Sequence, residues 1–285
     1  MSKKTVLAGL WLALFSLSVH AENILKVCAD PLNPPYSSKQ QDGFENKIAQ
    51  LFADDLKQTL QFYWFPQRIG FIRNTLTAAV DETAVEVKEY KCDVVMSVPA
   101  SSDMTLNTTA YYRSTYVLMI AQGRGWDDIT ESQQLAKLSL ARQDQLKIAM
   151  FDRSPGTAWL QKQGLLAQGI SYQSMTGDDA NNTAMQIAQD FNSKKIDMVI
   201  LWGPMAAYVA AQSPAGSYAL LPMKSSQDIA FDFSMAMGVR KSDKDLKQTL
   251  DKLIVKHKVK ITEILTSYHI PLLPLGSEKI LKDKD

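Results

Sequence analysis

The sequence predicts an α/β protein of two lobes, joined by a two-segment hinge with a cleft between them. Short β-branched apolar runs alternate with helical patterns, an order that requires parallel strands and right-handed crossovers. After a linker around Gly123–Trp126 the pattern begins again, and DMVILWGP in the second half parallels CDVVMSVP in the first. The run 229–240 then returns towards the first lobe. Two crossings between lobes make a hinge.

These observations divide the chain into four parts. Residues 1–21 read as a bacterial-type signal peptide, because Lys3-Lys4 precede an apolar run that ends in the small residues of a cleavage site after Ala21. Residues 22–119 form the first part of lobe 1, and residues 120–228 form lobe 2. Residues 229–285 supply the return crossover and the rest of lobe 1. We therefore expect a periplasmic protein that lacks a membrane span once the signal is removed.

The first lobe opens with a strand at 24–29, which the turn-rich Asn33-Pro34-Pro35 follows. A helix at 44–58 has apolar residues at helical spacing, and an aromatic strand follows at 60–65. Residues 66–73 are expected to lead to a second helix that runs through Leu76 and Ala79. The charged run DETAVEVKEY either extends that helix or forms a surface excursion. The buried strand Val94–Met96 is expected to stop at Ser97-Val98-Pro99.

The second lobe repeats this order. A strand at 116–120 leads out of the first lobe. Strands of the second lobe are expected at 146–150, 170–173 and 197–201, with helices after Pro155, at 182–194 and at 204–212. After the return run, two amphipathic helices are expected near 244–256 and 260–268. The charges of the 31 basic and 30 acidic residues nearly cancel, so the net charge gives no indication of nucleic-acid binding.

Candidate binding residues lie at or just after the carboxyl ends of strands, where open α/β sheets bind ligands. Aromatic rings are frequent among them, which favours a hydrophobic or planar partner over a small polar solute. In lobe 1 these residues are Asp30, Tyr36, Trp64, Arg68, Phe71, Arg73, Pro99, Asp103, Tyr111, Tyr112 and Arg113. In lobe 2 they are Ser154, Gly156, Thr157, Trp159 and Trp202.

Catalytic and metal-binding patterns are weak. The mature chain has only His257 and His269, without a second ligand at metal spacing, and no nucleophile or phosphate-binding motif is present. We therefore predict no catalytic residue, metal or cofactor. Cys28 and Cys92 flank strands of one lobe and are expected to form a disulfide, the alternative being two buried thiols.

Three segments resemble one known family. VCADPLNPPYSSKQQDGFENKIAQLFADDL, WFPQRIGFIRNTL and CDVVMSVP…YYRSTYV are similar to the MoxJ/MxaJ and XoxJ group of periplasmic solute-binding proteins, which are associated with quinoprotein dehydrogenases. The resemblance covers the mature chain and is dense over residues 25–120. It implies a type II periplasmic binding protein fold without catalysis of its own.

The role that the resemblance implies is assistance to a methanol dehydrogenase that depends on pyrroloquinoline quinone (PQQ), in assembly, activation or protein contacts. The enzyme and its cytochrome c are the implied partners in methanol oxidation. Thr109-Ala110 stand where XoxJ-like members tend to read Arg-Pro, Ile69 replaces a second Arg, and DETAVEVKEY looks like an insertion.

Two other functions stay open. One is a transport-type binding protein for a small aromatic or quinone-like solute. Free amino acids fit poorly, because amino-acid binders place an Arg after the third strand and an Asp after the DMVIL-type strand. Here those neighbourhoods offer Ser101–Met104 and Trp202. The other is an enzyme on the same fold that would use Asp30 or Asp103.

Overall fold

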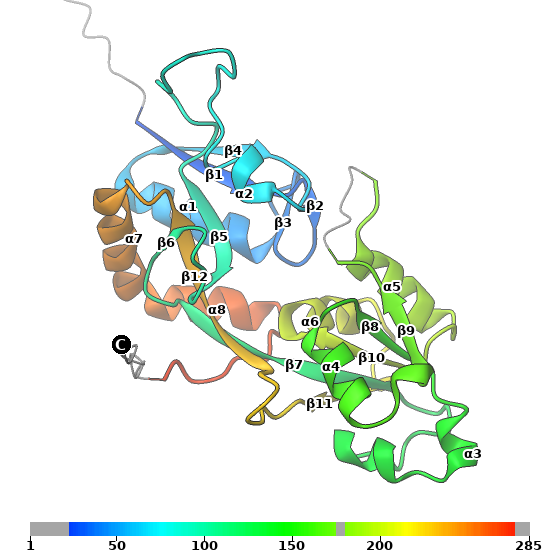
Figure 1. The fold of residues 1–285 in the computed structure, drawn as a ribbon. Helices are drawn as coiled ribbons and strands as arrows, with labels where there is room; N and C mark the ends of the chain where they lie inside the picture. Colours follow the sequence, from blue (N-terminus) through cyan, green and yellow to red (C-terminus); the bar gives the residue numbers. More distant parts are fainter. Residues whose placement is uncertain (1–22, 175–179, 277–285) are drawn as a thin grey trace, which may run out of the picture.

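The computed structural model describes residues 23–174 and 180–276, and the predicted signal peptide lies outside these residues. The described chain folds into two α/β lobes that share one mixed sheet (Figure 1). The strand order is β4-β1-β5-β12-β7-β10-β8-β9, so lobe 1 occupies one end of the sheet and lobe 2 the other. Within the described ranges, no helix is both long and apolar enough to cross a membrane.

Lobe 1 is built around β1 (Ile24–Ala29), which pairs in parallel with β4 (Thr59–Trp64) on one side and β5 (Val94–Pro99) on the other. Helix α1 (Phe44–Leu56) packs on this sheet through Phe44, Ile48 and Phe52, which recur at helical spacing and are almost fully buried. Helices α7 (Lys244–Lys256) and α8 (Lys258–Ser267) contribute Leu250, Leu253 and Leu265 to the same core, so the returning chain completes the lobe.

Lobe 2 repeats the arrangement with shorter elements. Its strands are β8 (Ile148–Phe151), β9 (Gly169–Tyr172), β10 (Met198–Trp202) and β11 (Tyr218–Pro222), and β8 pairs in parallel with both β9 and β10. Helices α4 (Pro155–Lys162), α5 (Thr183–Asn192) and α6 (Gly203–Ala211) follow β8, β9 and β10 in turn. Two buried clusters, around Trp159 and around Phe191, fill this lobe.

Strand β7 (Tyr112–Ala121) joins the two lobes. Its first residues, Tyr112–Thr115, pair with β12 (Asp232–Val239) in lobe 1, and its later residues pair with β10 and β11 in lobe 2. The predicted strand at 116–120 is therefore the lobe-2 half of a longer strand. The chain returns to lobe 1 at β12, and these two strands form the hinge (Figure 1).

Side chains and the carboxyl-terminal tail reinforce the hinge. Arg113 forms an ion pair with Asp232 across β7 and β12, and its Nε lies 3.1 Å from the Asp232 carboxylate. The Ser114 hydroxyl donates to the Pro271 carbonyl at 2.7 Å, and the Leu273 N–H donates to the Arg113 carbonyl at 2.8 Å. The tail therefore runs beside the hinge strand.

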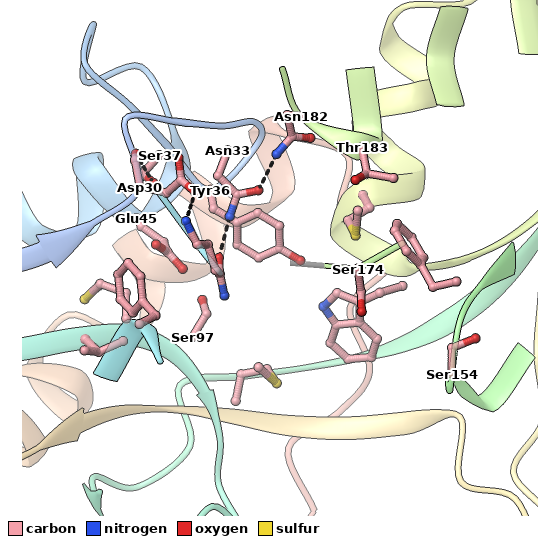
Figure 2. A pocket seen from close by; sticks show the side chains of 18 of the residues that line it. Asp30, Asn33, Tyr36, Ser37, Glu45, Ser97, Ser154, Ser174, Asn182 and Thr183 are labelled. Carbon is pink, nitrogen blue, oxygen red and sulfur yellow. Dashed lines mark hydrogen bonds between the residues drawn. The ribbon is translucent and has the colours of Figure 1, made fainter. Parts of the chain in front are cut away.

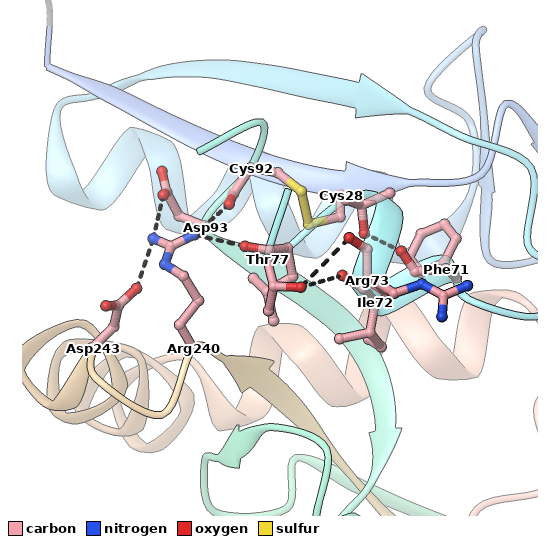
Figure 3. The surroundings of a disulfide bond; sticks show 11 residues. Cys28, Phe71, Ile72, Arg73, Thr77, Cys92, Asp93, Arg240 and Asp243 are labelled. Atoms are coloured by element: carbon pink, nitrogen blue, oxygen red, sulfur yellow. Dashed lines mark hydrogen bonds and ion pairs between the residues drawn. A yellow bond between two sulfur atoms is a disulfide. The ribbon is translucent and has the colours of Figure 1, made fainter. Parts of the chain in front are cut away.

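The predicted disulfide is confirmed: Cys28 and Cys92 are bonded, with their Cα atoms 5.3 Å apart (Figure 3). The pairing of β1 with β5 brings these segments together, because Cys28 lies opposite Val95. Arg240 supports the same region by donating to the Cys92 carbonyl at 2.6 Å and to the Asp93 carboxylate at 2.6 Å. The disulfide thus ties the carboxyl-terminal part of β1 to the segment that leads into β5.

Two expected elements differ in the structure. The helix expected through Leu76 and Ala79 is absent from the described residues 75–80, and the structure has the short α2 (Phe71–Asn74) before them. Thr75 leaves helical geometry, and its hydroxyl donates to the Phe71 carbonyl at 2.7 Å. Strand β5 continues through Pro99 instead of stopping at Ser97, because the distant strand β12 pairs with its last residues. DETAVEVKEY forms an excursion from lobe 1, closed by the bridge between Ala79 and Tyr90 (Figure 1).

The remaining elements are short. They are β2 (Leu32–Asn33), β3 (Ser37–Ser38), β6 (Leu106–Asn107), α3 (Leu140–Gln143) and the 3₁₀ turns η1 (Ser132–Lys137) and η2 (Leu166–Gln168).

Candidate functional site

A cavity of about 370 Å³ lies between the lobes (Figure 2). Lobe 1 contributes the end of β1, the loop after it and the middle of β5. Lobe 2 contributes the segment between β8 and α4 and the starts of α5 and α6. The strands β1, β8 and β10 all end at this cavity, as expected for ligand sites in α/β sheets.

Asp30 organises the lobe-1 wall. It follows β1, is only 4% exposed, and its carboxylate accepts the backbone N–H groups of Leu32 at 2.7 Å and Gln67 at 2.5 Å. Its carbonyl accepts the Ser37 hydroxyl at 2.8 Å. Asp30 therefore holds the loops after β1 and β4 in place around the cavity.

Glu45 is a second buried carboxyl group on this wall. It lies in the first turn of α1, and 8% of its surface is exposed. The pKa of Glu45 is raised to about 7 as the net result of three effects. Burial is the largest and raises the pKa, a hydrogen bond from the Ser97 hydroxyl lowers it, and the charge of Asp30 raises it further. Glu45 can thus change its charge near neutral pH.

Ser97 lies beside Glu45 in an unusual backbone conformation. Its φ is +49°, in the left-handed region that few residues other than glycine adopt, and the pairing of β5 with β12 is irregular here. The Ser97 hydroxyl lies 2.8 Å from the Tyr111 hydroxyl and accepts the Tyr112 hydroxyl at 3.3 Å. Burial raises the pKa of both tyrosines, which therefore stay neutral. Backbone strain of this kind persists where the surrounding contacts enforce it.

Aromatic rings line the part of the cavity near the hinge. Tyr116 and Trp202 also lie against each other, with ring centroids 5.6 Å apart, and Phe233 packs against both. Burial raises the pKa of Tyr116 to about 12, so its hydroxyl is neutral. Phe151 and Met205 extend this apolar surface on the lobe-2 side. The cavity therefore combines a polar, acidic end with an aromatic end.

A hydrogen bond between Asn182 and Asn33 joins the lobes across the cleft. The Asn182 side-chain amide, just before α5, donates to the Asn33 side-chain oxygen at 3.2 Å (Figure 2). Asn33 in turn donates to the Gln67 side chain at 2.8 Å. Nearby, the Ser154 hydroxyl caps α4 by accepting the Thr157 N–H at 3.3 Å. The Ser154 hydroxyl is therefore engaged as the N-cap of α4.

The structure places five of the predicted residues in the cavity wall: Asp30, Tyr36, Phe71, Ser154 and Trp202. Tyr111 and Tyr112 lie directly behind the wall, where they contact Ser97.

The other predicted residues lie elsewhere. Arg68, Arg73, Pro99 and Asp103 are exposed outside the cavity lining, and Trp64 stacks on Phe62. Arg113 belongs to the hinge, Gly156 faces Ile200, Thr157 donates to the Phe151 carbonyl and Trp159 is buried in the lobe-2 core.

Sequence reasoning missed Glu45, Ser97, Asn33 and Asn182. Glu45 looks like an ordinary first-turn acid of an amphipathic helix. Its burial comes from Gly43, where a Cβ atom would lie 2.1 Å from the Tyr36 carbonyl oxygen, so the loop after β1 closes directly on α1. The only local sequence feature that could have predicted this burial is a glycine just before a helix with an acidic first turn, and that feature is weak.

The ionic clamp of amino-acid binders is not reproduced at its usual positions. Asp30 and Glu45 supply carboxylates from lobe 1 instead, and Arg153 lines the lobe-2 side as an exposed residue next to Asp152. In the described part of the chain, no group of three His, Cys, Asp or Glu side chains could hold a metal ion.

Comparisons with known proteins agree with this architecture. No family model matches the sequence. Protein MoxJ from Paracoccus denitrificans is 28% identical over 284 residues, which cover 92% of this chain and 94% of that protein. The crystal structure of MxaJ from Methylophaga aminisulfidivorans is 25% identical with a TM-score of 0.70, over 87% of this chain and all of that one. An ancestral cationic amino acid solute-binding protein at 17% identity shares the fold alone, with a TM-score of 0.62.

The crystal structure of the periplasmic binding protein XoxJ from Methylobacterium extorquens AM1 is 31% identical, with a TM-score of 0.68, over 88% of this chain and 99% of that one. Two α/β lobes, a two-strand hinge and a cavity between the lobes define a periplasmic binding protein of the type II class. The chain belongs to the MoxJ/MxaJ/XoxJ group of these proteins.

Proposed function

We propose that this chain is a non-enzymatic accessory protein of the methanol oxidation system, which assists the assembly or activation of a PQQ-dependent methanol dehydrogenase in the periplasm. The observation that carries this proposal is the match to XoxJ at 31% identity over 99% of that protein. The whole two-lobed framework is therefore retained, including the hinge.

The contacts around the cavity support binding over catalysis. The Asp30 carboxylate is engaged by two backbone N–H groups, which suits a structural role. Asp103, the other acid considered for an enzymatic role, is exposed outside the cavity lining. The interlobe hydrogen bond between Asn182 and Asn33 bridges the cleft, and a partner that enters the cleft would replace it.

A pull-down with purified components tests the proposal. The mature chain, from residue 22 onward, is immobilised and exposed to a PQQ-dependent methanol dehydrogenase and its cytochrome c. We expect retention of the dehydrogenase, and a change in its activity when the chain is added. Absence of a complex together with unchanged activity would contradict the proposal.

The cavity favours a second function, a transport-type binding protein for a small solute. Its volume of about 370 Å³ and its mixture of rings with a few polar groups are typical of small-molecule sites. A thermal shift with a small ligand, in a protein that does not retain the dehydrogenase, would favour this function over the first.

A further inference from the structure

The acidic end of the cavity contains two buried carboxyl groups on one wall. Glu45 is 8% exposed and Asp30 is 4% exposed, and both line the space between the lobes (Figure 2). Asp30 has backbone partners that hold it in place. Glu45 instead faces the cavity from the first turn of α1, beside Ser97.

None of the described groups that act electrostatically on Glu45 carries a positive charge that would offset its negative charge. The described neighbours that act on it electrostatically are the Ser97 hydroxyl, Asp30 and the neutral Tyr36, Tyr111 and Tyr112. Asp30 has the same sign of charge. The amino-terminal end of α1 favours an anion, but only modestly. An ionised carboxylate in this position is therefore costly unless a cation approaches it from the cavity.

The rest of the cavity would hold an apolar body. Trp202 and Tyr116 present ring surfaces near the hinge, and Phe151 and Met205 also line the cavity. Indole and phenol faces attract cations as well as apolar groups. Arg153 and Asp152 line the lobe-2 side as exposed residues, and the Asp152 carboxylate accepts the Ser171 hydroxyl.

We propose that the cavity binds a small organic cation, with its ammonium or guanidinium group at Glu45 and Asp30 and its apolar part against Trp202 and Tyr116. An organic anion with its charged group at the same end would meet the two acids and should bind more weakly. The inference concerns the ligand of the cavity and does not depend on an interaction with a dehydrogenase.

Isothermal titration calorimetry with matched probes tests this inference. The probes are 2-phenylethylamine, neutral 2-phenylethanol and anionic phenylacetate, together with choline and its uncharged analogue 3,3-dimethyl-1-butanol. We expect at least one of the two cations to bind about tenfold or more tightly than its neutral counterpart, and phenylacetate to bind weakest. Equal or tighter binding of the neutral or anionic probes would overturn the proposal, as would failure of both cations to bind at millimolar concentration.

A variant separates the charge effect from general damage to the cavity. Glu45→Gln keeps the shape of the side chain, and we expect it to weaken binding of the cation about tenfold while leaving 2-phenylethanol unaffected. Glu263→Gln, the same substitution on the exposed face of α8, serves as the matched control and should change neither. Unchanged cation binding in Glu45→Gln would overturn the proposal.

The pH dependence gives a second readout. Choline has a fixed charge, so its affinity should follow ionisation of Glu45. For a pKa of about 7 and a neutral form that binds about tenfold more weakly, the affinity should rise about sevenfold from pH 5.5 to pH 8. The rise should disappear in Glu45→Gln. A flat profile in the wild-type protein would contradict the assignment. If Glu45→Gln loses cation binding but still retains the dehydrogenase in the pull-down, the cavity ligand and the proposed accessory role are independent of each other.

Discussion

Replacing Glu45 by Gln should make the protein more stable, and more so as pH rises. Glu45 is only 8% exposed, and the pKa of its carboxyl group increases from the ordinary 4.5 to about 7, chiefly through burial. In the unfolded chain the same group ionises freely near its ordinary pKa. Gln stays neutral at every pH and keeps an oxygen that accepts the Ser97 hydroxyl.

The sign of the effect follows from proton linkage. Because the folded-state pKa is above the unfolded-state pKa, the carboxyl group contributes its full stability below pH 4.5 and loses it as pH rises towards 7. One pKa unit corresponds to about 1.36 kcal/mol. The difference in the free energy of unfolding between Glu45→Gln and wild type should therefore be about 2.5 kcal/mol larger at pH 8 than at pH 5, in favour of the variant.

Urea unfolding at pH 5 and pH 8, followed by tryptophan fluorescence, measures this gain. The exposed variant Glu263→Gln controls for loss of a negative charge and should show no comparable gain. An equal stability difference between wild type and Glu45→Gln at both pH values would refute the reasoning. It would mean that the pKa of Glu45 is the same in the folded protein and in the unfolded chain.

Three further predictions concern the framework around the cavity. Replacing Cys28 and Cys92 by Ser opens a link between residues 64 apart in sequence and should lower the free energy of unfolding by about 4 kcal/mol in urea titrations, whereas a loss below 1 kcal/mol would contradict the loop-closure argument. A double-mutant cycle of Arg113→Met and Asp232→Asn should give a coupling of about 1 kcal/mol, because both side chains are partly exposed; zero coupling would remove the ion pair from the account of the hinge. Asn182→Ala should separate the lobes and increase the radius of gyration in small-angle X-ray scattering, and an unchanged radius would show that this hydrogen bond does not hold the cleft.

Local patterns in the sequence account for most of the fold. The strand predicted at 24–29 coincides with β1, and helical spacing identified the face of α1 that Phe44 and Ile48 bury. Errors arose where a distant segment decides the local structure. Strand β5 runs through Pro99 because β12, about 140 residues later in the chain, pairs with it. No local pattern contains that partner.

The candidate site was less predictable than the fold. Strand ends led to Asp30 and Trp202, because parallel strands bring their carboxyl ends to one edge. The burial of Glu45 depends on the close approach of the loop after β1 to Gly43. The contact of Asn182 with Asn33 depends on the distance between the two lobes. These features arise from tertiary packing, and the residues involved look like ordinary surface residues in the sequence.

The yield of active enzyme tests the proposed accessory role most directly. A PQQ-dependent methanol dehydrogenase is produced in the periplasm of one host with and without this chain, and the fraction that contains PQQ and oxidises methanol is measured. The account predicts a larger active fraction when the chain is present. Equal active fractions at equal dehydrogenase levels would contradict it.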